Sequence, residues 1–187
     1  MSTATPVAPR RASLTAFTAL RAVVVAVLAV VVTFSADHTP AFGLAVFGVF
    51  AVVQGAVIAA GVRGFAVSRA GRLLVVLRGA VLVVVGVLSL ALVGGATIGA
   101  LLSAEIAGFL GAGVLEVLSG LRRADASPAS RDLITVGGLE VLVGVMLAIL
   151  LPDSIFAVGV LSAWGAVVAV YLGIAAVSIA RREGAVR

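Results

Sequence analysis

The 187-residue chain contains no cysteine, no lysine and a single histidine, His38. The lack of cysteine excludes disulfides, thiolate metal sites and cysteine nucleophiles, and one histidine cannot build a multi-histidine metal cluster within one chain. Charged residues are also scarce, at 11% of the sequence, whereas a soluble domain carries roughly 25%. Because a water-facing surface cannot be built from so few charges, the sequence predicts that most of the protein surface faces lipid.

Hydrophobic residues make up 63% of the chain, and the mean hydropathy is +1.31. They are mostly Val, Ala and Leu, accompanied by 22 Gly, which are the residues that let membrane helices pack closely. Six apolar stretches of about 20 residues or more match a hydrocarbon core of roughly 30 Å. We therefore predict an all-α integral membrane six-helix bundle, with spans at 14–34, 41–62, 73–93, 96–119, 133–151 and 155–180.

All 13 basic residues are Arg, and they gather at the two ends of the chain and around the second and fourth links between spans. With six spans these Arg all lie on one side, whereas five or seven spans would divide them between both sides. Positive residues mark the cytoplasmic side, so we predict that both termini lie in the cytoplasm. The absence of Lys and the richness in Ala, Val, Arg and Gly indicate GC-rich coding and a bacterial source, so the expected location is the inner (plasma) membrane. A cleaved signal peptide is disfavoured because Phe34 stands where cleavage prefers a small residue.

The predicted organisation is one membrane domain, residues 14–180, between a disordered N-terminal tail (1–13) and a cytoplasmic C-terminal tail (181–187). The sequence of this domain repeats about every 58 residues, which predicts three transmembrane hairpins at about 14–64, 73–123 and 133–182. Odd spans share matched small residues, and even spans share a late Gly followed by an Arg. These positions are Ala22, Gly79 and Gly137; Ala29, Gly86 and Gly144; Gly55, Gly113 and Gly173; and Arg63, Arg122 and Arg181.

Charged residues inside the spans are the candidate functional residues, because a charge at a helix centre costs about 2.5–3.5 kcal/mol on insertion scales. Glu105 has no oppositely charged neighbour in the sequence, and we expect burial to keep it protonated near neutral pH. One interpretation is a proton-binding site or sensor. The commoner alternative is a structural hydrogen bond between helices.

Four further charges, Arg21, Arg78, Glu116 and Glu140, are predicted to share the level of the inner leaflet. The favoured interpretation is a belt of ion pairs that joins the three hairpins. The alternative is a polar vestibule that leads toward Glu105.

Small residues spaced four apart form a stripe in the fourth span, and the sixth span repeats the pattern. Such stripes allow close approach of another helix, and we expect packing within one chain in preference to a homo-oligomer or a membrane protein partner. The stripes comprise Gly95, Gly99, Ser103, Ala107 and Gly111, and then Gly165, Ala169 and Gly173.

The three-hairpin pattern resembles the HdeD family of small acid-resistance membrane proteins. Leu77-Arg78-Gly79 matches the element that begins an odd span in that family, and residues 113–117 (GVLEV), followed by Arg122-Arg123, match the element that ends an even span. The resemblance covers nearly the whole chain after the tail. The third repeat departs from it, with Val136-Gly137 in place of Arg-Gly. The resemblance implies a role in acid or envelope stress tolerance and implies no reaction.

No catalytic signature is present in the sequence, so we predict a non-enzymatic protein without a cofactor, in contact with the lipid bilayer and not with nucleic acid. The leading function is stress tolerance of the HdeD type. One alternative is a small proton-linked transporter or channel that uses Glu105 and Glu116. Another is a membrane scaffold that binds a partner through the small-residue faces. His38 in the first outer link is a candidate acid sensor, although a lone loop histidine usually has no special role.

Overall fold

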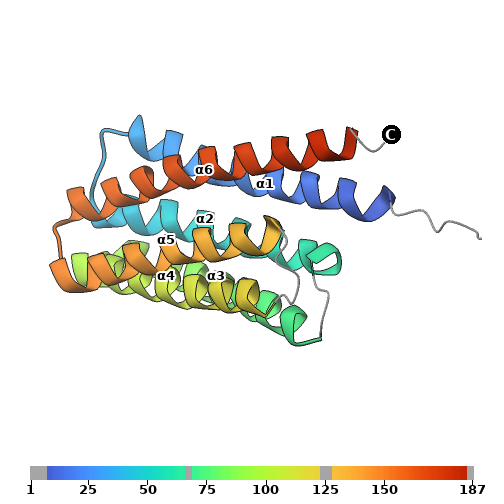
Figure 1. The fold of residues 1–187 in the computed structure, drawn as a ribbon. Helices are drawn as coiled ribbons and strands as arrows, with labels where there is room; N and C mark the ends of the chain where they lie inside the picture. The colour runs from blue at the N-terminus through green and yellow to red at the C-terminus, as the bar shows by residue number, and fades with distance from the viewer. Residues whose placement is uncertain (1–7, 66–68, 123–127, 185–187) are drawn as a thin grey trace, which may run out of the picture.

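The computed structural model describes residues 8–65, 69–122 and 128–184, and within these ranges it contains six long α-helices, one short 3-10 helix and no strand. The helices run alternately up and down, so the start of α1 and the end of α6 lie at the same end of the bundle (Figure 1). This confirms the predicted all-α six-helix bundle. The elements are α1 (Ala8–Thr33), α2 (Pro40–Phe65), α3 (Arg69–Ala91), the 3-10 helix η1 (Val93–Gly95), α4 (Ile98–Leu121), α5 (Pro128–Leu150) and α6 (Ser154–Gly184).

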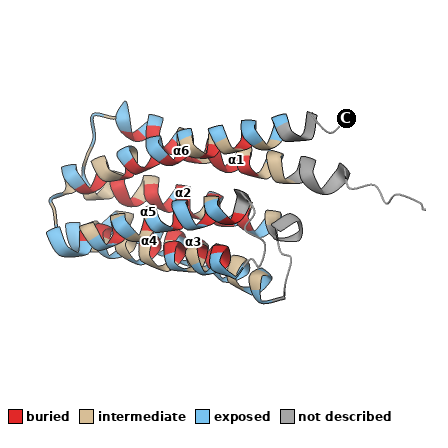
Figure 2. Ribbon diagram, viewed as in Figure 1, coloured by how far each residue is buried: buried red, intermediate tan, exposed pale blue. Residues whose placement is uncertain are grey.

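Each of the six helices contains a segment of 20 to 28 residues that is long and apolar enough to cross a membrane, with mean hydropathy between 1.8 and 2.7. The outward faces of the helices are exposed and the inward faces are buried (Figure 2). Those outward faces carry many large aliphatic side chains, such as Val84, Leu142 and Ile174. Soluble proteins rarely expose so large an apolar surface to water, so these faces contact lipid. The chain is therefore a multi-pass membrane protein.

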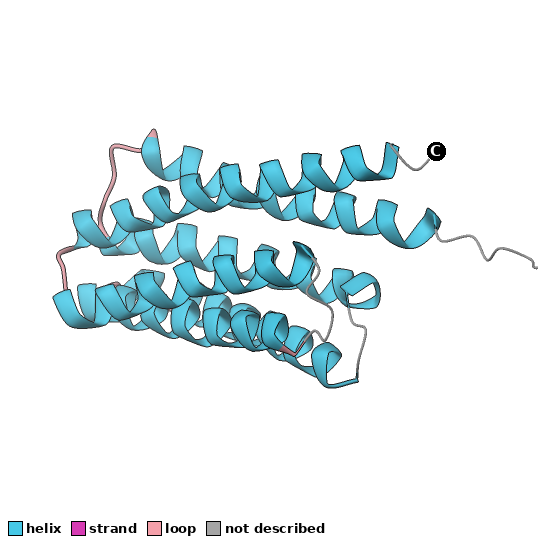
Figure 3. Ribbon diagram, viewed as in Figure 1, coloured by secondary structure: helices cyan, strands magenta, loops and turns pink. Residues whose placement is uncertain are grey.

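Two helices extend into the predicted tails. α1 begins at Ala8, so the second half of the predicted disordered tail (1–13) is helical, while residues 1–7 lie outside the described part of the chain. Pro9 is tolerated there because a helix needs no N–H bond in its first turn, and Arg and Ala favour helix. α6 likewise continues to Gly184, into the predicted tail at 181–187, of which residues 185–187 are not described. Within the described ranges, loop residues occur only in the links between helices (Figure 3).

The closest helix pairs are α1 with α6, α2 with α3, and α4 with α5. These pairs join neighbouring hairpins, and the first one closes the ring between the two ends of the chain. Glycines make the contacts close: a Cβ on Gly55 would lie 2.7 Å from the carbonyl O of Gly79, and a Cβ on Gly113 would lie 2.9 Å from that of Gly137. Most of the glycines matched between repeats therefore hold adjacent hairpins together, because only a residue without a side chain permits this approach.

The small-residue stripe of α4 does not pack as predicted. Of its three glycines, only Gly111 meets another helix, because a Cβ there would lie 3.0 Å from Val81. In α6 a Cβ on Gly165 would lie 3.3 Å from Ala29, whereas a Cβ on Gly173 would meet no atom within 4 Å. The expectation of packing within one chain is wrong for the rest, because α4 turns a different face, that of Gly113, toward α5. The exposed members are Gly95, Gly99, Ser103 and Ala107.

Candidate functional site

Among the residues that the structure describes, five charged side chains are buried, each no more than 5% exposed: Arg21, Arg78, Glu105, Glu116 and Glu140. They come from α1, α3, α4 and α5. The structure divides them into a connected group of four and the isolated Glu105.

The group of four forms a continuous chain of ion pairs. Arg21 Nη2 donates to Glu116 Oε1 over 2.8 Å, and Arg78 Nη2 lies 2.7 Å from Glu116 Oε2 and 2.9 Å from Glu140 Oε1. The order Arg21–Glu116–Arg78–Glu140 links four helices and carries no net formal charge. The structure thus brings these residues together as the ion-pair interpretation of the sequence predicted.

A small cavity adjoins these ion pairs. It has a volume of about 20 Å³ and is lined in part by Arg21, Arg78, Glu116 and Ser119. The Nε atoms of both Arg side chains are buried without a hydrogen-bond partner in the described structure. The cavity has roughly the volume that one water molecule requires, and its lining offers polar partners. The four-residue chain is therefore a compact neutral cluster with space for a single small molecule.

Glu105 lies apart from this cluster. It precedes Glu116 by eleven residues on α4, which places it about 16 Å further along the helix axis, toward the end of the bundle that holds η1. The buried residues of α4 between the two carboxyl groups are all nonpolar: Gly108, Phe109, Ala112 and Gly113. On this helix the arrangement provides no polar vestibule that leads from the ion pairs to Glu105.

The surroundings of Glu105 are apolar. Leu101 and Phe109, one turn away on either side along α4, both belong to the main hydrophobic core. Phe109 packs edge-on against Trp164, with ring centroids 5.0 Å apart, and Trp164 packs edge-on against Phe50 at 5.7 Å. Residues of α2, α4 and α6 thus form an aromatic cluster one helical turn from the carboxyl group.

Glu105 is 0% exposed, and neither carboxyl oxygen has a hydrogen-bond partner in the described part of the chain. An ionised carboxylate there would lack both water and a counter-charge, at a cost of several kcal/mol. The structural interpretation of Glu105 required a hydrogen bond to another helix, and that bond is not present among the described residues. What the site can do chemically is hold a proton on an isolated carboxyl group.

Two polar contacts were not foreseen in the sequence. Tyr171 donates its hydroxyl to Asp132 Oδ1 over 2.9 Å, which joins α6 to α5. Thr33 and Ser162 form a hydroxyl–hydroxyl bond between α1 and α6. Tyr171 and Ser162 lie inside the apolar sixth span, where the sequence gives no sign of a polar partner, and only the fold reveals which side chains face each other.

At the end of the bundle opposite the start of α1 and the end of α6, the link 34–39 contains Asp37 and the link 151–153 contains Asp153. Asp37 accepts the backbone N–H of Thr39 over 2.8 Å, and this bond lowers the pKa of the Asp37 carboxyl below its usual value. Asp153 caps α6 by accepting the N–H of Phe156 over 2.9 Å. His38 lies beside Asp37, half-buried, with its ring near the carbonyl of Ala36. Within the described ranges, no group of three or more His, Cys, Asp or Glu side chains could hold a metal ion.

Comparison of the chain with protein-family models, with curated proteins and with solved structures finds no match.

Proposed function

We propose that the protein is a non-enzymatic component of a bacterial plasma membrane that contributes to tolerance of acid or envelope stress, and that Glu105 is the proton-binding group through which it responds. The resemblance to the HdeD family supports the stress role. The observation that carries the proposal is the carboxyl group of Glu105, which is fully buried and has no hydrogen-bond partner among the described residues.

An ionisable group inside a membrane is costly, so it is retained mainly where it pairs with another group or serves a function. Glu116 and Glu140 satisfy the first condition, because each lies within 3 Å of an Arg side chain. Glu105 forms no ion pair with a described residue, so a functional role is the remaining explanation for a carboxyl group at this depth. A proton that binds or leaves Glu105 changes the charge within the core of the bundle, and such a change favours one packing of the helices over another.

The proposed orientation places both termini and the Arg-bearing links in the cytoplasm, following the distribution of positive residues. Glu105 then lies in the outer half of the membrane, because it is the seventh residue after Ile98, the first residue of α4, and so only about 10 Å along the helix axis. This is the half nearer to external acid.

Survival after an acid pulse tests the proposal. A deletion strain is complemented with wild type, Glu105→Gln or Glu105→Asp at matched membrane levels. We expect wild type to restore survival and Glu105→Gln to fail, because the amide has the shape of the protonated acid but cannot exchange the proton. Glu105→Asp keeps a carboxyl group and retains part of the activity. Equal rescue by Glu105→Gln would remove the assigned role of Glu105, and absence of rescue by wild type would remove the stress role itself.

A proton-linked transporter or channel is the second candidate, and the same isolated carboxyl group favours it. The sequence suggested Glu116 as a second proton-binding group for transport, but two Arg side chains engage the Glu116 carboxylate. Proton flux into liposomes that contain the purified protein, lost in Glu105→Gln, would support transport over stress tolerance without flux.

A scaffold is the third candidate, and the exposure of Gly99 and Ser103 on α4 favours it. It predicts that Gly99→Leu abolishes the stress phenotype while Glu105→Gln leaves it intact.

A further inference from the structure

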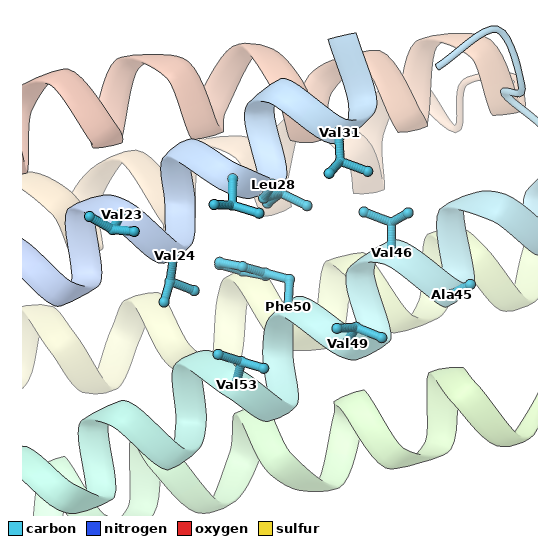
Figure 4. Close-up of a pocket in the computed structure, with 10 residues that line it drawn as sticks. Val23, Val24, Leu28, Val31, Ala45, Val46, Val49, Phe50 and Val53 are labelled. Atoms are coloured by element: carbon cyan, nitrogen blue, oxygen red, sulfur yellow. The ribbon is translucent and has the colours of Figure 1, made fainter. Parts of the chain in front are cut away.

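The lipid-facing seam between α1 and α2 contains a groove of about 390 Å³ (Figure 4). Ten residues line it and seven of them are valines, including Val23, Val27 and Val31 on α1 and Val49 and Val53 on α2. Phe50 points between the two helices in the close-up view. The lining is almost wholly apolar, so the occupant must be apolar as well.

The groove is a fixed feature of the fold. α1 and α2 pack less closely with each other than α1 packs with α6 or α2 with α3, and this leaves the seam open on the lipid side. Valine in a helix has essentially one favoured χ1 rotamer, so the walls cannot close the groove by turning their side chains. Inside a bilayer, such a space is filled by whatever apolar molecule lies beside it.

The groove matches the depth of one leaflet. Along α1 the groove runs from Val23 to Val31, which is about 12 Å of helix rise. Val31 lies two residues before Thr33, the last residue of α1, so this end of the groove is next to the 34–39 link. Half of a typical hydrocarbon core is about 15 Å deep. The groove therefore extends through most of the leaflet on the side of the 34–39 link.

The walls of the groove favour a hydrocarbon chain as the occupant. Seven of the ten lining residues are valines, whose short branched side chains offer no polar group to a partner, and the groove is open toward the lipid. An acyl chain lies beside the protein throughout the leaflet and needs no polar contact to occupy such a groove.

The link above the groove indicates the headgroup. Asp37 is a fully exposed carboxylate in that link, and its low pKa keeps it ionised at neutral pH. No Arg occurs in residues 34–39. This end of the groove therefore favours a cationic amine over an anionic lipid headgroup.

We propose that the α1–α2 groove is a specific binding site for one acyl chain of a phospholipid with an amine-bearing headgroup, taken from the leaflet on the side of the 34–39 link. This site is separate from Glu105 and does not depend on the proposed stress role. Its occupant bridges two hairpin helices whose direct contact is limited.

Retention of lipid by the purified protein tests the site. Wild type is reconstituted in vesicles of phosphatidylethanolamine and phosphatidylglycerol, extracted in mild detergent, and the bound lipid is counted by native mass spectrometry. Val27→Phe and Val49→Phe fill the groove. Val84→Phe and Val167→Phe, at positions equally exposed elsewhere on the bundle, are the matched controls, since all four valines are 54–57% exposed.

We expect wild type and both controls to retain phosphatidylethanolamine, and both groove variants to lose it at least tenfold. Asp37→Asn should keep the bound chain but lose the preference for phosphatidylethanolamine over phosphatidylglycerol. Equal retention by groove and control variants would overturn the proposal. So would a wild-type dimer that becomes monomeric only in the groove variants, because the groove would then be an interface between two copies.

Discussion

The central role of Glu116 in the buried ion pairs leads to a quantitative prediction about stability. In Glu116→Gln the side chain keeps its shape but loses its charge, and the two Arg side chains that it contacts at 2.8 and 2.7 Å respond differently. Arg78 still has Glu140 at 2.9 Å, whereas Arg21 forms no other ion pair in the described structure. One buried charge is left unpaired, so we expect a loss of about 3–5 kcal/mol in the free energy of unfolding.

The double variant Arg21→Met/Glu116→Gln sharpens this prediction, because it removes both members of the broken pair and leaves Arg78 and Glu140 balanced. We expect it to be more stable than Glu116→Gln alone by about 2 kcal/mol, within the usual range for coupled neighbours. Reversible unfolding in mixed micelles with increasing dodecyl sulfate measures each variant. Glu105→Gln is the control and should change stability by less than about 1 kcal/mol, since it loses no hydrogen bond. A Glu116→Gln variant as stable as wild type, or strictly additive effects in the double variant, would refute the reasoning.

Further predictions concern packing, an interhelical hydrogen bond and a loop carboxylate. Gly113→Ala places a methyl group against the backbone of α5 and should cost about 1–3 kcal/mol in the same unfolding assay, whereas Gly99→Ala, in open space, should be neutral or slightly stabilising; equal effects would contradict the assigned contacts. Tyr171→Phe removes the bond to Asp132 and should lower the free energy of unfolding by about 1 kcal/mol, with no loss in a variant that already lacks the Asp132 carboxylate. Carbon NMR of Asp37 should give a titration midpoint below the ordinary aspartate value of 3.8, because the ionised form accepts a backbone N–H. The loop should therefore keep this contact at pH values above that ordinary value and lose it as the pH falls through the lowered pKa; a midpoint at or above 3.8 would contradict the hydrogen bond.

The sequence was sufficient for the number, order and approximate limits of the helices, because apolar length alone decides whether a segment can span a bilayer. It also placed Arg21, Arg78, Glu116 and Glu140 at one level, since their depth follows from their distance to the Arg-bearing ends. Helix length beyond the membrane was underestimated. The polar residues next to a span, such as those near Ala8, end the apolar pattern without ending the helix.

The direction in which each helix faces was not predictable to the same degree. The spacing of Gly95, Gly99 and Ser103 indicated a packing face, but small residues every four positions look the same whether they meet a helix or lipid. Gly55 and Gly113 proved to be the positions where one helix backbone comes closest to its neighbour. These two glycines occupy matched positions in successive repeats, and that recurrence predicted helix contacts better than the spacing of four within α4. Whether a described residue pairs with Glu105 depends on what the five other helices place nearby, and no local pattern in the sequence encodes that.

The ion pair between Arg21 and Glu116 joins residues 95 positions apart in the chain, and this separation matters during synthesis. At a synthesis rate of about 5–20 residues per second, roughly 5–20 s pass between the synthesis of Arg21 and that of Glu116. During that interval a nascent α1 must hold a lone positive charge near the membrane, with its long side chain reaching toward the headgroups. Insertion of the first helix is therefore provisional, and the order in which the helices leave the ribosome becomes part of how this bundle assembles.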